Sequence, residues 1–170
     1  MAMANRKLQE AVEEEMCVSV DEQMTCYKGK HAPSGLSQYL PSKPTSHGFK
    51  SFARAGISGF AYEIRYYTGA QTNQWYVSSV PNFDSLLKTT KTVLRLTEHC
   101  KPGSFIYFDN LFASKQLFEE LSKRGLHYVC TLRPNRFKEV PFTPKPQFEK
   151  LQMGTYESFF NEEAGYCVVA

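Results

Sequence analysis

The sequence lacks any run of eighteen apolar residues, and its first fifteen residues are polar and acidic. We therefore expect neither a transmembrane helix nor a secretory signal peptide. Cys-x-x-Cys pairs are also missing, since the five cysteines are scattered at positions 17, 26, 100, 130 and 167. This odd, scattered set predicts neither a zinc ribbon nor a disulfide framework, and it favours a reducing compartment.

The composition that remains is ordinary for a globular protein. The 170 residues are 42% hydrophobic and 22% charged, which excludes a disordered or fibrous chain. A chain of this length forms one domain with a substantial core and is short for two.

Acidic residues are absent between residues 23 and 54, a stretch that carries five cations. A second basic block, residues 123–150, carries seven cations and two acids. The centre is neutral and both ends are acidic, so the net charge is only +3. Two basic blocks around a neutral centre favour a polyanion such as DNA as partner. The alternative is that solvated loops happen to be basic.

The hydrophobic pattern predicts an α/β protein in which helices pack on the faces of a mixed sheet. Residues 29–48 hold three prolines and three glycines, so we expect a long irregular loop there. The run at 105–108 is apolar and aromatic, which indicates a strand buried on both faces. The expected helices cover residues 4–16, 83–99 and 114–125, and the expected strands cover residues 17–20, 49–55, 61–67, 105–108, 127–132, 155–160 and 166–169.

Two aspartates, Asp21 and Asp109, follow strands in this scheme. A strand–helix–strand crossover usually returns parallel, and the carboxyl ends of parallel strands are where α/β folds build their sites. If the two strands are neighbours, the two carboxylates meet and repel unless they share a cation. Mg²⁺ suits them because it binds one or two carboxylates and keeps positions for phosphate and water. The alternative is that each aspartate only starts the turn that follows it.

Six short motifs occur in an order that resembles the catalytic domain of the piggyBac transposase family. They run from residue 18 to residue 136, with a weaker fit through residue 170. The motifs are VDEQM at 20–24, YKGK at 27–30, QYLPSKP with GFK at 38–50, YYTG at 66–69, FDNLFAS at 108–114 and TLRPNR at 131–136.

The resemblance implies a ribonuclease-H-like fold in which three aspartates hold two Mg²⁺ ions for DNA strand cleavage and joining. The first two fall on Asp21 and Asp109, which become the expected catalytic and metal-binding residues. The third is expected beyond the strand at 166–169, so the domain is truncated at its C-terminal end. The expected layout is a helix or linker at 1–16 and a partial catalytic domain at 17–170, with a basic loop at about 26–50.

The function implied is that of part of a piggyBac-like DNA transposase, inactive as a fragment without the third aspartate. The alternative is a domesticated, transposase-derived DNA-binding or architectural protein. The implied partners are double-stranded DNA (transposon ends and a TTAA target) and no membrane. Localisation is expected to be nuclear, and a homodimer is one of the oligomeric states left open. The cations expected to contact phosphate are Lys28, Lys30, Lys43, Lys50, Arg133 and Arg136.

Overall fold

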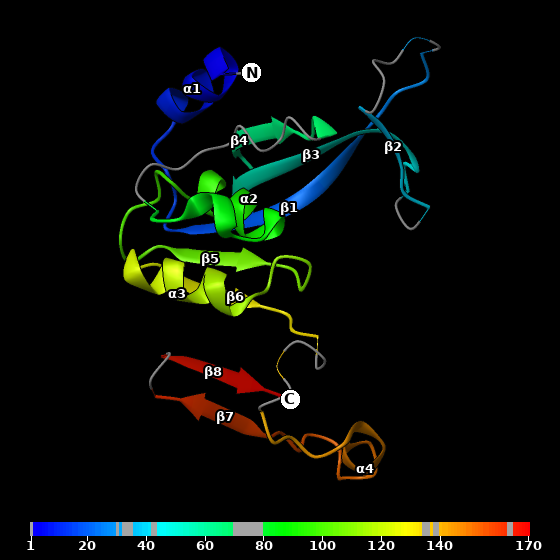
Figure 1. Cartoon of the computed structure of the whole chain (residues 1–170), viewed down its shortest axis with the longest axis vertical. Helices are drawn as coiled ribbons and strands as arrows, with labels where there is room; N and C mark the ends of the chain where they lie inside the picture. The colour runs from blue at the N-terminus through cyan, green and yellow to red at the C-terminus, as the bar shows by residue number, and fades with distance from the viewer. Residues whose placement is uncertain are drawn as a thin grey trace. The chain divides into compact units, whose positions relative to one another are not determined.

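The computed structural model describes residues 2–29, 31, 36–41, 44–69, 80–133, 137, 140–162 and 165–170. The chain divides into two compact units, Met1–Thr131 and Leu132–Ala170. Figure 1 shows their elements, with labels on the α-helices and strands. In chain order these are α1 (Ala2–Ala11), β1 (Cys17–Cys26), β2 (Ser37–Tyr39), β3 (His47–Gly56), β4 (Ala61–Tyr66), η2 (Phe83–Ser85), α2 (Lys88–Leu96), β5 (Phe105–Phe108), α3 (Lys115–Lys123), β6 (His127–Cys130), α4 (Lys145–Phe148), β7 (Ser158–Asn161) and β8 (Tyr166–Val169).

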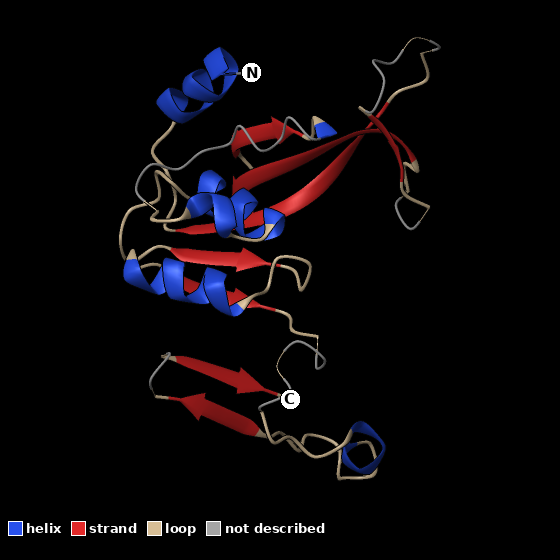
Figure 2. Cartoon of the chain, viewed as in Figure 1, coloured by secondary structure: helices blue, strands red, loops and turns tan. Residues whose placement is uncertain are grey.

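The first unit is built on a six-stranded mixed sheet, which confirms the predicted α/β class. Its strands lie in the order β2-β3-β1-β5-β6, and β4 also pairs with β3. β1 is antiparallel to β3 but parallel to β5, and β5 is parallel to β6. Helices α2 and α3 contact each other and pack against the sheet (Figure 2). β1, β5 and β6 are therefore consecutive parallel strands.

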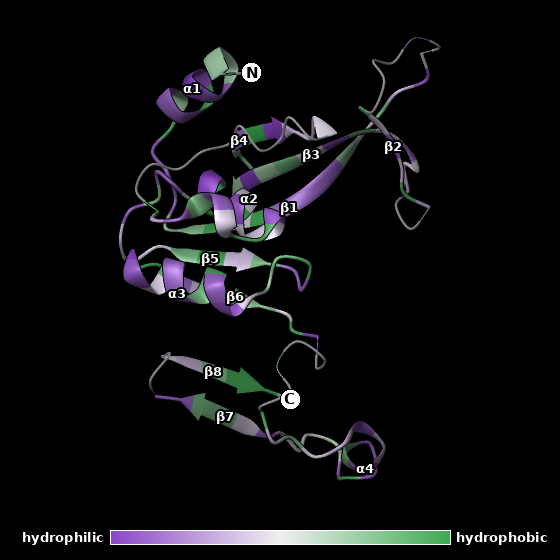
Figure 3. Ribbon diagram, in the orientation of Figure 1, coloured by the Kyte–Doolittle hydropathy of each residue, from purple (hydrophilic) through white to green (hydrophobic). Residues whose placement is uncertain are grey.

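The core of this unit follows from the two-residue period of the strands and the helical period of α2 and α3. Alternate residues of β1 and β5 are buried, among them Val20, Ile106 and Phe108. The helices contribute one apolar stripe each, while their other faces are polar, so Figure 3 shows hydrophilic and hydrophobic residues interleaved along both. The buried stripes consist of Val93, Leu94, Leu96, Leu117, Phe118 and Leu121.

The expectation that residues 105–108 are buried on both faces was wrong. Ile106 is fully buried, but Phe105 and Tyr107 are 42% and 41% exposed. Burial therefore alternates along β5, because its neighbours in the helices cover only the face that carries Ile106. The opposite face of the sheet carries half-exposed aromatic rings.

Two further boundaries differ from the prediction. β1 does not stop at residue 20 but runs to Cys26, because it pairs with β3 as far as the Cys26 and Gly48 pair. Residues 29–48 are not wholly irregular either, since β2 pairs antiparallel with the start of β3. The Leu40 amide bonds the Ser46 carbonyl at 2.8 Å and closes this small hairpin. Long-range backbone pairing thus outweighs the local count of proline and glycine.

The predicted helix at 83–99 is also shorter in the structure. Its first residues form the 3₁₀ turn η2, and the α-helix α2 ends at Leu96. Helix α3 agrees with its sequence signals: Ser114 Oγ accepts a hydrogen bond from the Leu117 amide at 3.2 Å, and Gly125 has a φ of 68° just after the helix. That left-handed backbone conformation is one that glycine adopts without strain.

The segment before β1 is fastened to the sheet by buried polar contacts. Asn5 of α1 bonds both backbone groups of Ile64 in β4, with distances of 3.0 and 3.1 Å. Arg54 in β3 is 0% exposed, pairs with Glu14 and lies 5.5 Å from the ring centroid of Tyr62. Charges and amides that are buried in this way need their partners, so the N-terminal segment belongs to the fold of the first unit.

The second unit contains α4 and the β7–β8 hairpin, which confirms the hairpin predicted at the end of the chain. Glu157 accepts hydrogen bonds from the amide and hydroxyl of Thr143, at 2.9 and 2.5 Å. These bonds hold the pKa of the Glu157 carboxyl below its ordinary value. Phe137 packs edge-on against Tyr166, with ring centroids 6.3 Å apart. In the described parts of both units, none of the helices combines the length and the apolarity that crossing a bilayer requires.

The packing of the central strand gives a first testable prediction. We expect Ile106→Ala to lower the free energy of unfolding by about 2–5 kcal/mol, because it leaves a cavity between sheet and helices. Ile57→Ala changes the same side chain where it is 80% exposed, and it should cost less than about 0.5 kcal/mol. Urea unfolding of both variants measures the difference. Equal losses would contradict the assignment of Ile106 to the core.

Candidate metal site at the ends of paired strands

The register of β1 and β5 brings Asp21 and Asp109 side by side. The last pair of the parallel ladder joins Val20 to Phe108, so the two aspartates occupy the next position on each strand. Neighbouring strands lie about 4.8 Å apart. Because Val20 and Phe108 face the helices, alternation directs both exposed aspartates to the opposite face. Asp109 comes after the last residue of β5, whereas Asp21 lies inside β1, at the point where its pairing with β5 ends.

Hydrogen bonds orient each carboxylate. Asp21 Oδ1 accepts from the Glu22 amide at 2.7 Å. Asp109 Oδ1 accepts from the Asn110 amide at 2.6 Å and from Thr131 Oγ1 at 2.8 Å. Both aspartates bond the amide of the next residue, whereas an aspartate that starts a turn bonds the amide two residues on, and Asp21 lies inside β1. Turn formation does not explain why two aspartates are adjacent across two strands.

The donor set fits a hard divalent cation. Two adjacent carboxylates repel each other in water, and a shared cation removes that repulsion. Mg²⁺ binds oxygen ligands and keeps several waters, which an exposed pair at a strand end permits. In the described ranges no group of three or more His, Cys, Asp or Glu side chains is placed to hold a metal. The described residues therefore provide a two-carboxylate site.

The charge of Asp109 also acts on the next strand. Burial, and to a lesser extent the negative charge of Asp109, raises the pKa of the Cys130 thiol to about 11. Cys130 lies opposite Phe108 in the pairing of β5 with β6. The thiol is thus an internal reporter of the charge at the site.

The six cations expected to contact phosphate have different positions. Lys28 is described and exposed, just beyond β1. Lys50 pairs with Glu22 at 2.5 Å, with only about a fifth of its side chain exposed. Arg133 is exposed and belongs to the second unit. The remaining three lie outside the described residues, namely Lys30, Lys43 and Arg136.

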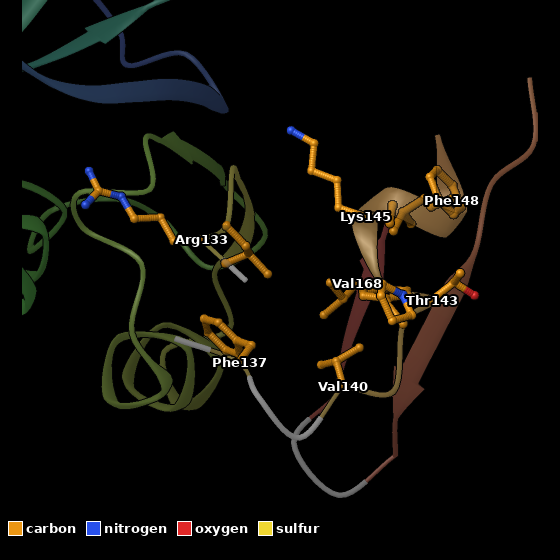
Figure 4. A pocket seen from close by; sticks show the side chains of 12 residues that line it. Arg133, Phe137, Val140, Thr143, Lys145, Phe148 and Val168 are labelled. Carbon is orange, nitrogen blue, oxygen red and sulfur yellow. The ribbon is translucent and has the colours of Figure 1, made fainter. Parts of the chain in front are cut away.

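The second unit contains a cavity of about 580 Å³ with a different chemistry (Figure 4). Its lining is mostly apolar and includes no acidic side chain, although Arg133 and Lys145 contribute to it. The apolar members include Phe137, Val140, Phe142, Phe148 and Val168. The carboxylate pair and this cavity therefore share no residue.

The sequence interpretation overlooked Thr131 as a member of the site. The motif at 131–136 contains it, but no role was derived from that motif. The available signal was its position, because Thr131 follows a strand parallel to β5 at the same offset as Asp109.

Comparisons with known proteins all find transposases or transposase-derived proteins. A family model described as Transposase IS4 matches residues 1–169. The human PiggyBac transposable element-derived protein 3 is 27% identical over 154 residues, which cover 90% of this chain and 25% of the relative. The human Chimeric ERCC6-PGBD3 protein is also 27% identical over 154 residues, covering 90% of this chain and 14% of the relative.

A cryo-EM structure of a piggyBac transposase synaptic complex with hairpin DNA is similar in fold. The TM-score is 0.62 at 22% identity, over 86% of this chain and 29% of that one. This likeness confirms the fold class expected from the sequence, a ribonuclease-H-like mixed sheet flanked by helices. The chain spans about a quarter of the first human relative and of the solved transposase chain.

The Cys130 thiol provides a test of the site's electrostatics. With a pKa of about 11, roughly one thiol in a thousand is ionised at pH 8, so alkylation of Cys130 should be slow there and accelerate up to about pH 11. Asp109→Asn removes the negative charge, lowers the thiol pKa and should accelerate alkylation at pH 8. Iodoacetamide labelling followed by peptide mass spectrometry measures the rate at each cysteine.

The exposed Glu119 of α3 provides the matched control, since Glu119→Gln removes the same charge elsewhere. That variant should leave the Cys130 rate unchanged. An Asp109→Asn rate equal to that of the parent chain would show that the carboxylate has no influence on β6.

Proposed function

Because the chain belongs to the IS4-type transposase family, with piggyBac-derived relatives, we propose that it forms part of a metal-dependent DNA cleavage and strand-transfer core. In this proposal Asp21 and Asp109 are the catalytic carboxylates. The observation that carries it is the parallel register that makes them neighbours on an exposed sheet face. Family membership alone would not select these two acids among seventeen.

The two residues would hold Mg²⁺ through their carboxylate oxygens. Bound there, the ion supplies Lewis-acid stabilisation of a phosphodiester and lowers the pKa of a coordinated water. The chain's own contribution is geometric: Asp109 is oriented by Asn110 and Thr131, and Asp21 by the Glu22 amide. Both side chains are exposed, so a ligand can reach them from solvent.

The resemblance assigns a third carboxylate to a position beyond β8. Within this proposal, two carboxylates bind metal weakly and misplace a second ion. The expected substrate is double-stranded DNA, namely transposon ends and a TTAA target, and the expected compartment is the nucleus. The piggyBac transposase of similar fold was solved in a synaptic complex with hairpin DNA, which supports DNA as the polymer.

A second candidate is a domesticated DNA-binding protein without transposition. It is favoured by the name of the human relative, which describes that protein as derived from a transposable element. Both carboxylates are present in this chain, which favours the enzymatic reading. Cutting and joining of TTAA-flanked DNA by the protein that contains this chain would decide for the enzyme. DNA binding without cleavage would decide for the second candidate.

Metal dependence gives the next prediction. We expect the 170-residue chain to bind Mg²⁺ or Mn²⁺ weakly, on the order of millimolar, and not to cut DNA. Asp21→Asn should weaken the binding further because it removes one of two anionic ligands, whereas Glu119→Gln should not change it. Isothermal titration and a strand-cleavage assay in Mg²⁺ measure the two properties. Robust cutting that Asp21→Asn abolishes would show that two carboxylates suffice.

Phosphate contacts are tested by salt. The logarithm of duplex affinity should fall linearly with the logarithm of salt concentration, and Lys28→Ala should reduce the slope by about 0.9 if Lys28 contacts one phosphate. Lys88→Ala removes an exposed lysine from the neutral central block and should leave the slope unchanged. Fluorescence anisotropy with a labelled duplex provides the affinities. A slope near zero for the parent chain would remove the phosphate-contact proposal.

A further inference from the structure

Thr131 completes a row of three polar residues on three adjacent parallel strands, each placed just beyond the last paired residue of the parallel ladder. β5 and β6 pair in register up to Phe108 and Cys130, as β1 and β5 do up to Val20 and Phe108. The next residue on each strand is Asp21, Asp109 and Thr131 in turn. Thr131 is exposed, so its hydroxyl lies on the open side of the sheet with the two carboxylates.

The direction of each hydrogen bond at Thr131 follows from chemistry. The Asn110 amide can only donate, so Thr131 Oγ1 accepts from it at 2.9 Å. An ionised carboxylate can only accept, so the Thr131 hydroxyl donates to Asp109 Oδ1 at 2.8 Å. The Asn110 amide also reaches the same Oδ1 at 2.6 Å. Three atoms thus fix one another, and Oδ1 receives two donors that set the plane of the carboxylate.

We propose that Thr131 is a positioning residue for Asp109, whose carboxylate it holds in the orientation needed to bind a divalent cation together with Asp21. This inference rests on the proposed function of the aspartate pair. Partners that orient a ligating carboxylate typically contribute 10- to 100-fold to metal affinity, although they do not touch the metal.

The turn after β5 has another support, which separates positioning from folding. The Phe112 amide bonds the Asp109 carbonyl at 3.0 Å and closes this turn through backbone atoms alone. Phe112 and Ala113 are buried and anchor the segment in the core. Loss of the Thr131 hydroxyl therefore removes one of the two donors to Asp109 Oδ1, leaves the bond from the Asn110 amide, and leaves the backbone in place.

The test titrates Mn²⁺ into the ¹⁵N-labelled 170-residue chain and follows paramagnetic broadening of the amides around Asp21 and Asp109. Thr131→Val, which keeps the shape of the side chain and removes the hydroxyl, should raise the midpoint about 10-fold. Thr131→Ser keeps the hydroxyl and should stay within about twofold of the parent chain. Thr25→Val makes the same change at an exposed position of β1 and should leave the midpoint unchanged.

The amide spectrum recorded before metal is added shows whether each variant is folded. If Thr131→Val perturbs that spectrum, Thr131→Ala, which also removes the hydroxyl, replaces it. A Thr131→Val midpoint equal to that of the parent overturns the positioning role and leaves the aspartate site intact. Two results would overturn the metal site, and the role of Thr131 with it. One is that the parent chain shows no broadening near the two aspartates, and the other is that Asp21→Asn leaves the broadening unchanged.

Discussion

The parallel pairing of β1 with β5 is the constraint on which the rest of the first unit depends. Its register buries Val20 and Phe108 under the helices, and the same register brings Asp21 and Asp109 together on the other face. A slip of one residue would reverse every side chain of the strand, so that Asp21 would enter the core. The apolar core therefore specifies where the two carboxylates lie.

Local sequence signals were sufficient to predict a structural feature wherever the interaction that determines it is local. Ser114 and Gly125 mark the two ends of α3 because a cap and a left-handed residue act within one helical turn. The sequence left open whether the strands that carry Asp21 and Asp109 are neighbours, and the β1–β5 pairing shows that they are, although 88 positions separate the two residues. The exposure of one face of β5 was not predictable from its apolar run, because the sequence pattern does not show whether helices cover one face of a strand or both.

The count of charges along the sequence overestimated the free positive charge of the first basic block, residues 23–54. Arg54 belongs to that block in the sequence, yet it is buried against Glu14, and Lys50 is paired with Glu22 across the β1–β3 ladder. Both partners lie in the acidic block that precedes it, so pairing between strands cancels charges that a linear count keeps apart. Thr131 was overlooked for the same reason: its role depends on a neighbouring strand, whereas its own motif contains nothing that distinguishes it from a solvated threonine.

The proposed function gives a reason for the aspartate pair that folding does not. Two like charges on adjacent strands oppose folding, and directly opposed like charges destabilise a sheet. The donors that reach Asp109 from the Asn110 amide and the Thr131 hydroxyl are neutral, and they orient the carboxylate. Under the proposed function, a cation shared by Asp21 and Asp109 would relieve the repulsion between the two carboxylates. Surface positions tolerate most polar residues, so folding alone does not account for two aspartates at these neighbouring positions.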